Sequence, residues 1–218
     1  MSIKKQKIYE SPSVTADTVI FTIDENKLKV LLIKRANQPF KNWWALPGVF
    51  LFKNESVGRA ALRALKEKTG VKIAYLEQLY TFDSPTRDPR GHVISTTYFA
   101  LCPSAKLPKS ALFSVSNLPK LAFDHKKIIN YAVSRLRAKL EYTNVAYSLL
   151  PKYFTLSQLQ EVYETVIGKK QDKRNFRKKF LSLGLIRQTR KKIFGARQRP
   201  AKLYEFISRR HAVLKKFF

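Results

Sequence analysis

The sequence predicts an α+β protein in which an α/β/α sandwich precedes a smaller helical domain with a basic two-stranded wing. Residues 12–102 place strand-like segments on both sides of one helical segment, which is typical of a sheet covered by helices. From residue 124 onward, apolar residues recur at helical spacing instead. Residues 1–118 carry 18 Lys and Arg against 9 Asp and Glu, net +9, whereas residues 119–218 carry 25 against 6, net +19. We therefore expect two domains, 1–120 and 121–218.

The composition limits the class of protein. With 218 residues, 44% of them hydrophobic, the chain can bury real cores, and its net charge of +28 attracts polyanions such as nucleic acid. No apolar run approaches the roughly 20 residues of a membrane span, and MSIKKQK lacks the apolar segment of a signal peptide. A single Cys102 excludes an internal disulfide, and three His with one Cys give no zinc-ligand spacing. We expect a cytoplasmic protein without membrane contact; a lysine-rich genome is an alternative source of part of the charge.

Strand signals dominate the first domain. Residues 12–23 alternate and then run apolar, and residues 28–35 follow as a second strand after a turn at 24–27. A polar loop at 35–44 leads to a strand and turn at 45–52. Residues 77–82 and 93–102 are expected to form two further strands.

One helix is expected between these strands, at residues 56–69. Gly70 supplies its end. The residues at three- and four-residue spacing that should face the sheet are Val57, Ala60, Ala61, Ala64 and Leu65.

The loop DSPTRDPRGH, residues 83–92, is stiffened by proline and carries two arginines. A guanidinium on a stiff loop can bind phosphate with two parallel hydrogen bonds, so Arg87 and Arg90 are candidates for ligand or dimer contacts. Salt bridges to Asp83 or Asp88 are the equally weighted alternative. Phe50 and Phe82 are candidates for stacking on an adenine, although an aromatic residue beside a strand is more often part of the core.

The second domain begins with a helix that starts at Asp124, a possible cap, and runs to about residue 140. A helix at 156–167 follows, with Thr155 as its cap and Gln158 completing a capping box. After a short connection, residues 173–183 form the next helix, and strands at 185–192 and 203–210 are joined by a loop at 193–202. This order of elements predicts a winged helix-turn-helix.

In such a fold the second helix of the pair enters the major groove of DNA. Arg and Asn read base edges and Lys mainly binds phosphate. The expected contacts come from the recognition helix and the wing; a basic helix that is merely solvated is the less favoured alternative. The candidate residues are Lys173, Arg174, Asn175, Arg177 and Lys178 on the helix, and Arg190, Lys191, Lys192, Arg197, Arg199 and Lys202 on the wing.

Residues 46–71, LPGVFLFKNESVGRAALRALKEKTGV, resemble a Nudix box, the loop–helix–loop with which Nudix hydrolases hold divalent metal against a diphosphate. The family pattern is Gly, five free positions, Glu, seven free positions, then Arg-Glu-apolar-any-Glu-Glu-any-Gly-apolar. It matches at Glu55, Arg63, Leu65, Glu67, Gly70 and Val71. It does not match at Val49, Ala64 and Lys68, which replace a Gly and two Glu.

The two missing glutamates belong to the carboxylate cluster that would hold the metal, because Mg²⁺ prefers carboxylate and phosphate oxygens. Ala64 and Lys68 are four positions apart and share a helix face, where an ammonium group repels cations. We therefore expect a domain without hydrolase activity, metal or cofactor. Lys68 could bind a nucleotide diphosphate directly, or be only a solvated helix residue.

The whole chain resembles the Nudix-related transcriptional regulators, the NrtR family, through VTADTVIFTI, LKVLLIKR, the degenerate box, LEQLYTF with RDPRG, DHKKII, FTLSQLQ, DKRNFRKK and RPAKLYEF. The resemblance implies a homodimeric repressor of NAD-biosynthesis genes, released from operator DNA by ADP-ribose or a related nucleotide. The residues proposed to bind this effector are Arg35, Phe50, Glu55, Arg63, Glu67, Lys68, Phe82, Arg87 and Arg90. Open alternatives are a sugar-responsive regulator, a Nudix hydrolase of ADP-ribose-like substrates and a basic RNA-binding protein.

Overall fold

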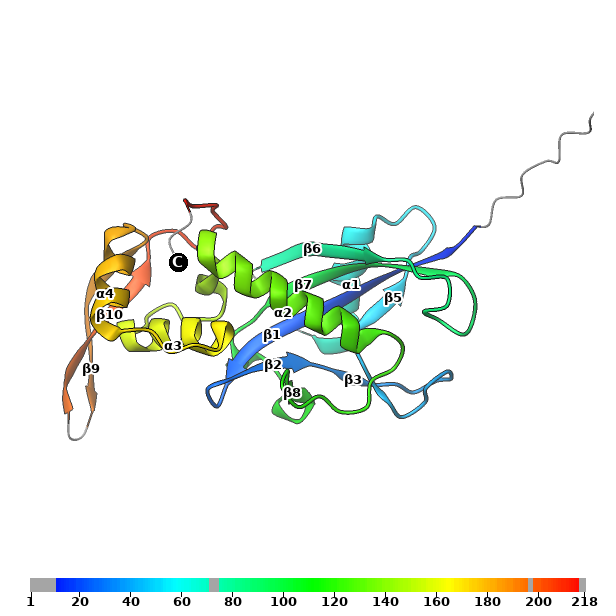
Figure 1. Ribbon diagram of the computed structural model, residues 1–218, viewed down its shortest axis with the longest axis horizontal. Coiled ribbons are helices and arrows are strands. Elements are labelled where there is room, and N and C mark those ends of the chain that lie inside the picture. Colours follow the sequence, from blue (N-terminus) through cyan, green and yellow to red (C-terminus); the bar gives the residue numbers. More distant parts are fainter. Residues whose placement is uncertain (1–10, 71–74, 196–197, 216–218) are drawn as a thin grey trace, which may run out of the picture.

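The computed structural model describes residues 11–70, 75–195 and 198–215. It is elongated, with a sheet covered on both faces at one end and a small winged domain at the other (Figure 1). None of the described helices is long and apolar enough to cross a bilayer. The predicted α+β class, an α/β/α sandwich followed by a winged helix-turn-helix, is confirmed.

The main sheet is mixed and has the strand order β6-β7-β1-β2-β8, with β5 paired to β1. Only the β1–β7 pair within it is parallel. The strands are β1 Ser13–Asp24, β2 Lys27–Leu31, β5 Gly48–Phe50, β6 Tyr75–Phe82, β7 Val93–Leu101 and β8 Leu112–Ser114.

The predicted turn at 24–27 joins β1 to β2, with Glu25 and Asn26 both at positive φ, as a two-residue hairpin turn requires. The second predicted strand, 28–35, is interrupted. The N–H of Leu32 leaves the sheet to bond Ala111 O, and β3 Ile33–Lys34 then pairs with β4 Trp44–Ala45 in a separate ladder.

Helix α1, Val57–Thr69, covers one face of the sheet. It is capped by Ser56 and ends at Gly70 in the left-handed region. Ala60, Ala61, Ala64 and Leu65 are buried, as the helical spacing predicted.

Helix α2, His125–Tyr142, lies on the opposite face, where it packs against β1 and β6 and reaches α3 (Figure 1). Its buried stripe includes Ile128, Ala132 and Leu136, and these belong to one hydrophobic core that continues into the winged domain. Because α2 packs on both parts of the chain, the boundary at residue 120 stays a prediction.

The winged domain contains α3 Leu156–Ile167, α4 Lys173–Ser182, β9 Ile186–Gly195 and β10 Gln198–Phe206. The predicted capping box of Thr155 and Gln158 is present, and Asp172 caps α4. The predicted wing boundaries were wrong, because the expected loop at 193–202 is largely paired strand and 207–210 lies beyond β10. A register shift between Gln198 and Ala201 accommodates Pro200 within the ladder.

Candidate ligand pocket and nucleic-acid interface

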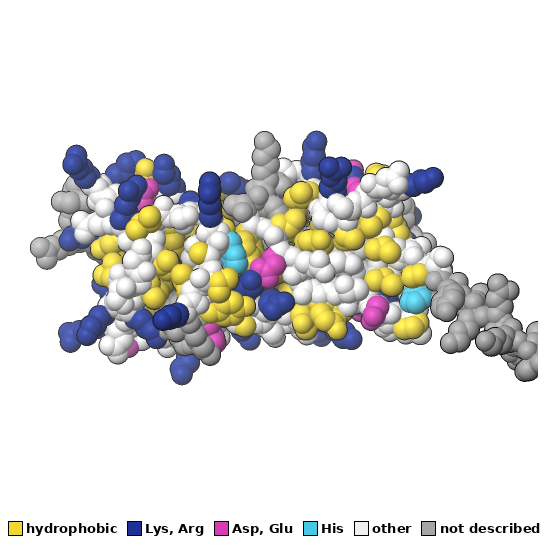
Figure 2. All heavy atoms as spheres, turned by 90° about the horizontal axis from the view of Figure 1, so that it is seen from above, with side chains coloured by type: hydrophobic (Ala, Val, Ile, Leu, Met, Phe, Trp, Pro, Cys, Tyr) yellow, Lys and Arg dark blue, Asp and Glu magenta, His cyan; other side chains and the backbone are white. Residues whose placement is uncertain are grey.

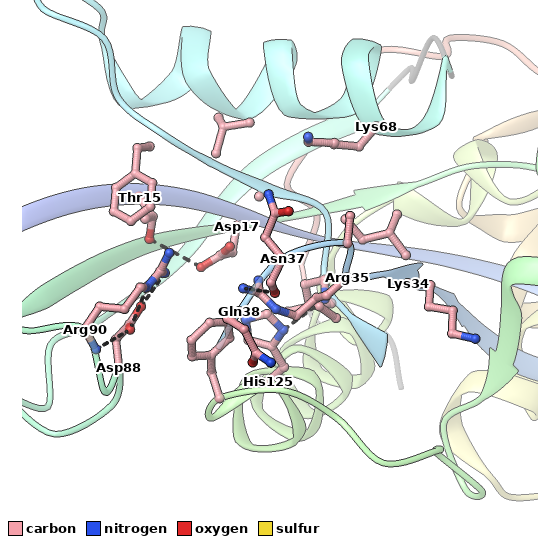
Figure 3. A pocket seen from close by; sticks show the side chains of 18 of the residues that line it. Thr15, Asp17, Lys34, Arg35, Asn37, Gln38, Lys68, Asp88, Arg90 and His125 are labelled. Atoms are coloured by element: carbon pink, nitrogen blue, oxygen red, sulfur yellow. Dashed lines mark hydrogen bonds and ion pairs between the residues drawn. The ribbon is translucent and has the colours of Figure 1, made fainter. Parts of the chain in front are cut away.

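A cavity of about 570 Å³ opens at the edge of the sheet, beside the start of α2 (Figure 3). Its volume is typical of a small-molecule site. Strand β1, residues 33–38, strand β5, the end of α1, the 83–92 loop and the first residues of α2 contribute to its wall. The lining residues include Thr15, Asp17, Lys34, Arg35, Asn37, Gln38, Gly48, Phe50, Glu67, Lys68, Arg87, Asp88, Arg90, Phe123 and His125.

Two guanidinium groups lie against aromatic rings in this cavity. Arg35 is 4.7 Å from the centroid of Phe123, and Arg90 is 5.1 Å from Phe50 and 5.5 Å from Phe123. Arg90 also donates two side-chain hydrogen bonds to Asp88, at 2.9 and 2.6 Å. Although burial opposes ionisation of Asp88, the hydrogen bonds from Arg90 hold its pKa below the usual value. The cavity can therefore offer both stacking surfaces and phosphate-binding cations.

Arg87 has a different partner from those predicted. Its side chain is buried and donates to both carboxylate oxygens of Asp124, at 3.0 and 2.7 Å, with Asp17 3.9 Å away. Asp124 stands at the N-terminus of α2, but its side chain caps no backbone N–H because Arg87 occupies it. The predicted capping role of Asp124 was wrong, and Arg87 fastens the 83–92 loop to α2. For Arg90, the salt bridge to Asp88 is confirmed.

Asp17 was not predicted as a site residue. Its carboxylate accepts a hydrogen bond from Ser95 Oγ at 2.5 Å, and a Cβ at Gly48 would lie 1.8 Å from its Oδ1. A side chain at position 48 would therefore have to displace the Asp17 carboxylate from its place beside Ser95. A carboxylate in the middle of a predicted strand, between Ala16 and Thr18, is the sequence signal that could have identified Asp17.

Of the positions named in the box pattern, Val49, Glu67 and Lys68 line the cavity, and Lys68 extends from the last turns of α1 (Figure 3). Glu55 and Arg63 do not line it. Arg63 donates to Glu55 at 2.8 and 2.7 Å and to Phe50 O at 2.8 Å, which fastens the preceding loop to α1. Hydrogen bonds from Arg63 and from the N–H of Phe52 lower the pKa of Glu55 to about 2.

Phe82 also lies outside the cavity. It is 6% exposed, belongs to the main core and packs edge-on against Tyr80 and Tyr131. Six of the nine predicted effector residues are therefore brought together, namely Arg35, Phe50, Glu67, Lys68, Arg87 and Arg90. Asn37, Gln38, Phe123 and His125 join them without having been predicted.

The position of Ala64 is fully buried, and the carboxylate of Glu55 is already bound by Arg63. Within the described ranges, no three His, Cys, Asp or Glu side chains are grouped in a way that would hold a metal ion. The residues present therefore do not fit the metal cluster of a Nudix hydrolase.

The opposite end of the molecule presents a basic face. Lys173, Arg174, Asn175 and Lys178 are exposed on α4, whereas Arg177 is half-buried and donates to Ser157 Oγ at 3.1 Å. Figure 2 shows Lys and Arg gathered over this end. Arg190, Lys191 and Lys202 are exposed on the wing. Arg197 lies outside the described residues, and so do the side chains of Lys192 and Arg199.

Sequence reasoning missed one group beside the wing. Lys191 Nζ lies 4.0 Å from the ring centroid of Tyr153, and Lys152 Nζ lies 5.3 Å from the same centroid. The loop that carries Tyr153 is tied to β10 through the Phe154–Tyr204 bridge. The basic face therefore extends to the entry of α3.

A covered sheet with a ligand-sized cavity, joined through α2 to a winged helix with an exposed basic recognition helix, defines a ligand-sensing DNA-binding regulator. The sequence matches the NUDIX domain over residues 14–131 and the NrtR DNA-binding winged helix domain over residues 146–206. The chain belongs to the NrtR family of regulators.

Two known proteins, one of them in two crystal structures, illustrate this membership. The ADPR-responsive transcriptional repressor NtrR of Acinetobacter baylyi is 39% identical over 210 residues, which are 91% of this chain and 83% of the relative. The crystal structure of Shewanella oneidensis NrtR complexed with a 27mer DNA is 36% identical with a TM-score of 0.81, covering 88% of this chain and 93% of that one. The NUDIX domain of the same Shewanella protein, crystallised with ADP ribose, is 35% identical with a TM-score of 0.50, covering 59% and 90%.

Proposed function

We propose that this protein is a homodimeric cytoplasmic repressor of NAD-biosynthesis genes that leaves its operator when ADP-ribose or a related nucleotide fills the cavity. The observation that supports this proposal most is that the guanidinium groups of Arg35 and Arg90 lie over the rings of Phe123 and Phe50 in one cavity. The Acinetobacter relative named as ADPR-responsive and the Shewanella NUDIX domain crystallised with ADP ribose support this choice of effector.

The cavity offers complementary chemistry to each half of such a ligand. An adenine can stack on Phe50 or Phe123, and a diphosphate can accept hydrogen bonds from Arg35 and Arg90. Lys68 adds a third cation at the end of α1. Asp17, Asp88 and Glu67 on the same walls would accept hydrogen bonds from ribose hydroxyls.

We further propose that the domain binds without hydrolysing. Where the hydrolase pattern has two glutamates, this chain has a fully buried Ala64 and the ammonium group of Lys68. A diphosphate held by cations of the protein needs no bridging metal. Metal-dependent cleavage of ADP-ribose to AMP and ribose 5-phosphate at an enzymatic rate would instead identify a Nudix hydrolase.

The deciding experiment measures binding of the full-length protein to the duplex upstream of its own gene, and to a random duplex of equal length. We expect a preference for the upstream site, read as a pseudo-palindrome by a dimer, and a steep loss of affinity with salt. ADP-ribose should weaken the specific complex, whereas simple sugars should not. Equal affinity for both duplexes would refute the regulator, and release by a sugar alone would refute the nucleotide effector.

A further inference from the structure

His125 is the first residue of α2, and its side chain lines the cavity (Figure 3). The residue is only 3% exposed, and its ring lies 5.3 Å from that of Phe123. A polar ring at this depth is favoured only where its nitrogens find hydrogen-bond partners.

One ring nitrogen has its partner in the protein. The N–H of Leu46 donates to Nδ1 at 2.9 Å. Nδ1 must therefore carry a lone pair, and the neutral ring has its proton on Nε2. An imidazolium would set two N–H groups against each other at this contact.

The other nitrogen has no hydrogen-bond partner among the described residues. Over the part of the chain that the structure describes, Nε2 of His125 makes no hydrogen bond. Since Nδ1 faces Leu46, Nε2 projects from the far side of the ring. The protein thus fixes both the orientation of the ring and the identity of its free donor.

The electrostatic surroundings keep this donor neutral. Burial lowers the pKa of His125, the carboxylates Asp17 and Asp124 oppose the decrease, and Arg87 and Arg35 reinforce it. The ring is therefore a neutral donor beside cations, which suits an oxygen acceptor that those cations also attract.

We propose that Nε2–H of His125 donates to an oxygen acceptor of the nucleoside diphosphate sugar in the cavity, and that this contact determines which ligands bind. The proposal rests on the nucleotide effector proposed above. It assigns recognition to a residue outside the Nudix-box helix, on the helix that continues toward the winged domain.

Two isosteric variants separate the two nitrogens. In His125→Asn, the amide oxygen replaces Nδ1 and still accepts from Leu46, but nothing occupies the Nε2 position. In His125→Gln, the amide nitrogen replaces the Nε2 donor while the acceptor for Leu46 is lost. His125→Asn should therefore lose ligand affinity, whereas His125→Gln should mainly lose stability.

Calorimetric titration of the full-length protein with ADP-ribose tests this expectation. We expect His125→Asn to bind about tenfold or more weakly, while its operator affinity without ligand and its thermal midpoint stay near those of the wild type. His125→Gln should bind within about threefold of the wild type but melt at a lower temperature.

Equal ADP-ribose affinity of His125→Asn and the wild type would overturn the role of His125 and leave the proposed function standing. No ADP-ribose binding by the wild type would overturn both. Nitrogen-15 NMR of the ligand-free protein supplies an independent readout, because a proton found on Nδ1 would refute the donor at Nε2 whatever the affinities.

Discussion

Arg87 and Asp124 join the 83–92 loop to the first turn of α2 through two hydrogen bonds of 3.0 and 2.7 Å. The Arg87 side chain is 3% exposed and that of Asp124 is 19% exposed, so little solvent screens the pair. Replacing Arg87 with Met should leave the Asp124 carboxylate without its partner and lower the free energy of unfolding by about 3 kcal/mol.

Urea unfolding at neutral pH measures this loss. Arg187→Met is the matched control, because Arg187 also binds a carboxylate, that of Glu205, but is 68% exposed. The control should lose less than about 1 kcal/mol. Equal losses in the two variants would contradict the structural role of Arg87.

The Glu55–Arg63 pair predicts a dependence of stability on pH. The pKa of Glu55 is lowered to about 2 because Arg63 donates two hydrogen bonds to its carboxylate and Phe52 a third. A lowered pKa stabilises the folded state above the ordinary value of 4.5, and this contribution is lost as pH falls toward 2. Glu55→Gln should therefore be less stable than the wild type near neutral pH, and thermal midpoints should converge on acidification. If the difference between the two thermal midpoints did not change with pH, the lowered pKa of Glu55 would be refuted.

Local patterns predicted well what depends on neighbours in sequence. The buried stripe of α1 follows from helical spacing, and the capping box at Thr155 from a four-residue motif. The contacts of the site were harder to predict from the sequence, because Arg87 and Asp124 are 37 residues apart, and Leu46 and His125 are 79 apart. No local signal joins such residues until the fold does. In the wing, the loop predicted at 193–202 was too long, because the strands continue through a register shift between Gln198 and Ala201.

Lys68 provides a test of how the cavity holds a diphosphate. Lys68→Glu adds a carboxylate to the three already in the cavity wall, those of Asp17, Glu67 and Asp88, which should repel the ligand and weaken ADP-ribose binding by about tenfold or more. Lys68→Arg keeps the charge and should change affinity much less. Calorimetric titration with ADP-ribose measures both affinities. Unchanged affinity in Lys68→Glu would show that Lys68 is a solvated residue without a role in binding.

Adding Glu at Ala64 as well should favour metal binding, but at a cost in stability because this position is fully buried.

The recognition helix and the wing should differ in how they affect specificity. Arg174 is exposed near the start of α4, and its replacement by Ala should cost about 1–3 kcal/mol on the operator and little on random duplex. Lys202→Ala on the wing should weaken both duplexes alike and reduce the salt dependence by about one unit of slope. Fluorescence anisotropy over a salt series measures both effects. If Arg174→Ala weakened the two duplexes equally, Arg174 would contact phosphate only.

Helix α2 connects the cavity to the winged domain, and Arg137 makes one of its polar contacts at the far end. Its Nε donates to Val166 O at 2.9 Å, so the helix that begins in the cavity also holds the last turn of α3. A ligand can shift DNA binding only as far as it distinguishes two arrangements of the protein, and coupling requires a contact between the parts that move. Arg137→Met should therefore bind ADP-ribose and operator separately with nearly wild-type affinity, while the ratio of operator affinities without and with ADP-ribose moves toward one.

Lys127→Met removes the same charge from an exposed position on the same helix and should leave the ratio unchanged. A wild-type ratio in Arg137→Met would show that the signal passes elsewhere, and an equal decrease in Lys127→Met would attribute it to charge rather than to the contact with α3.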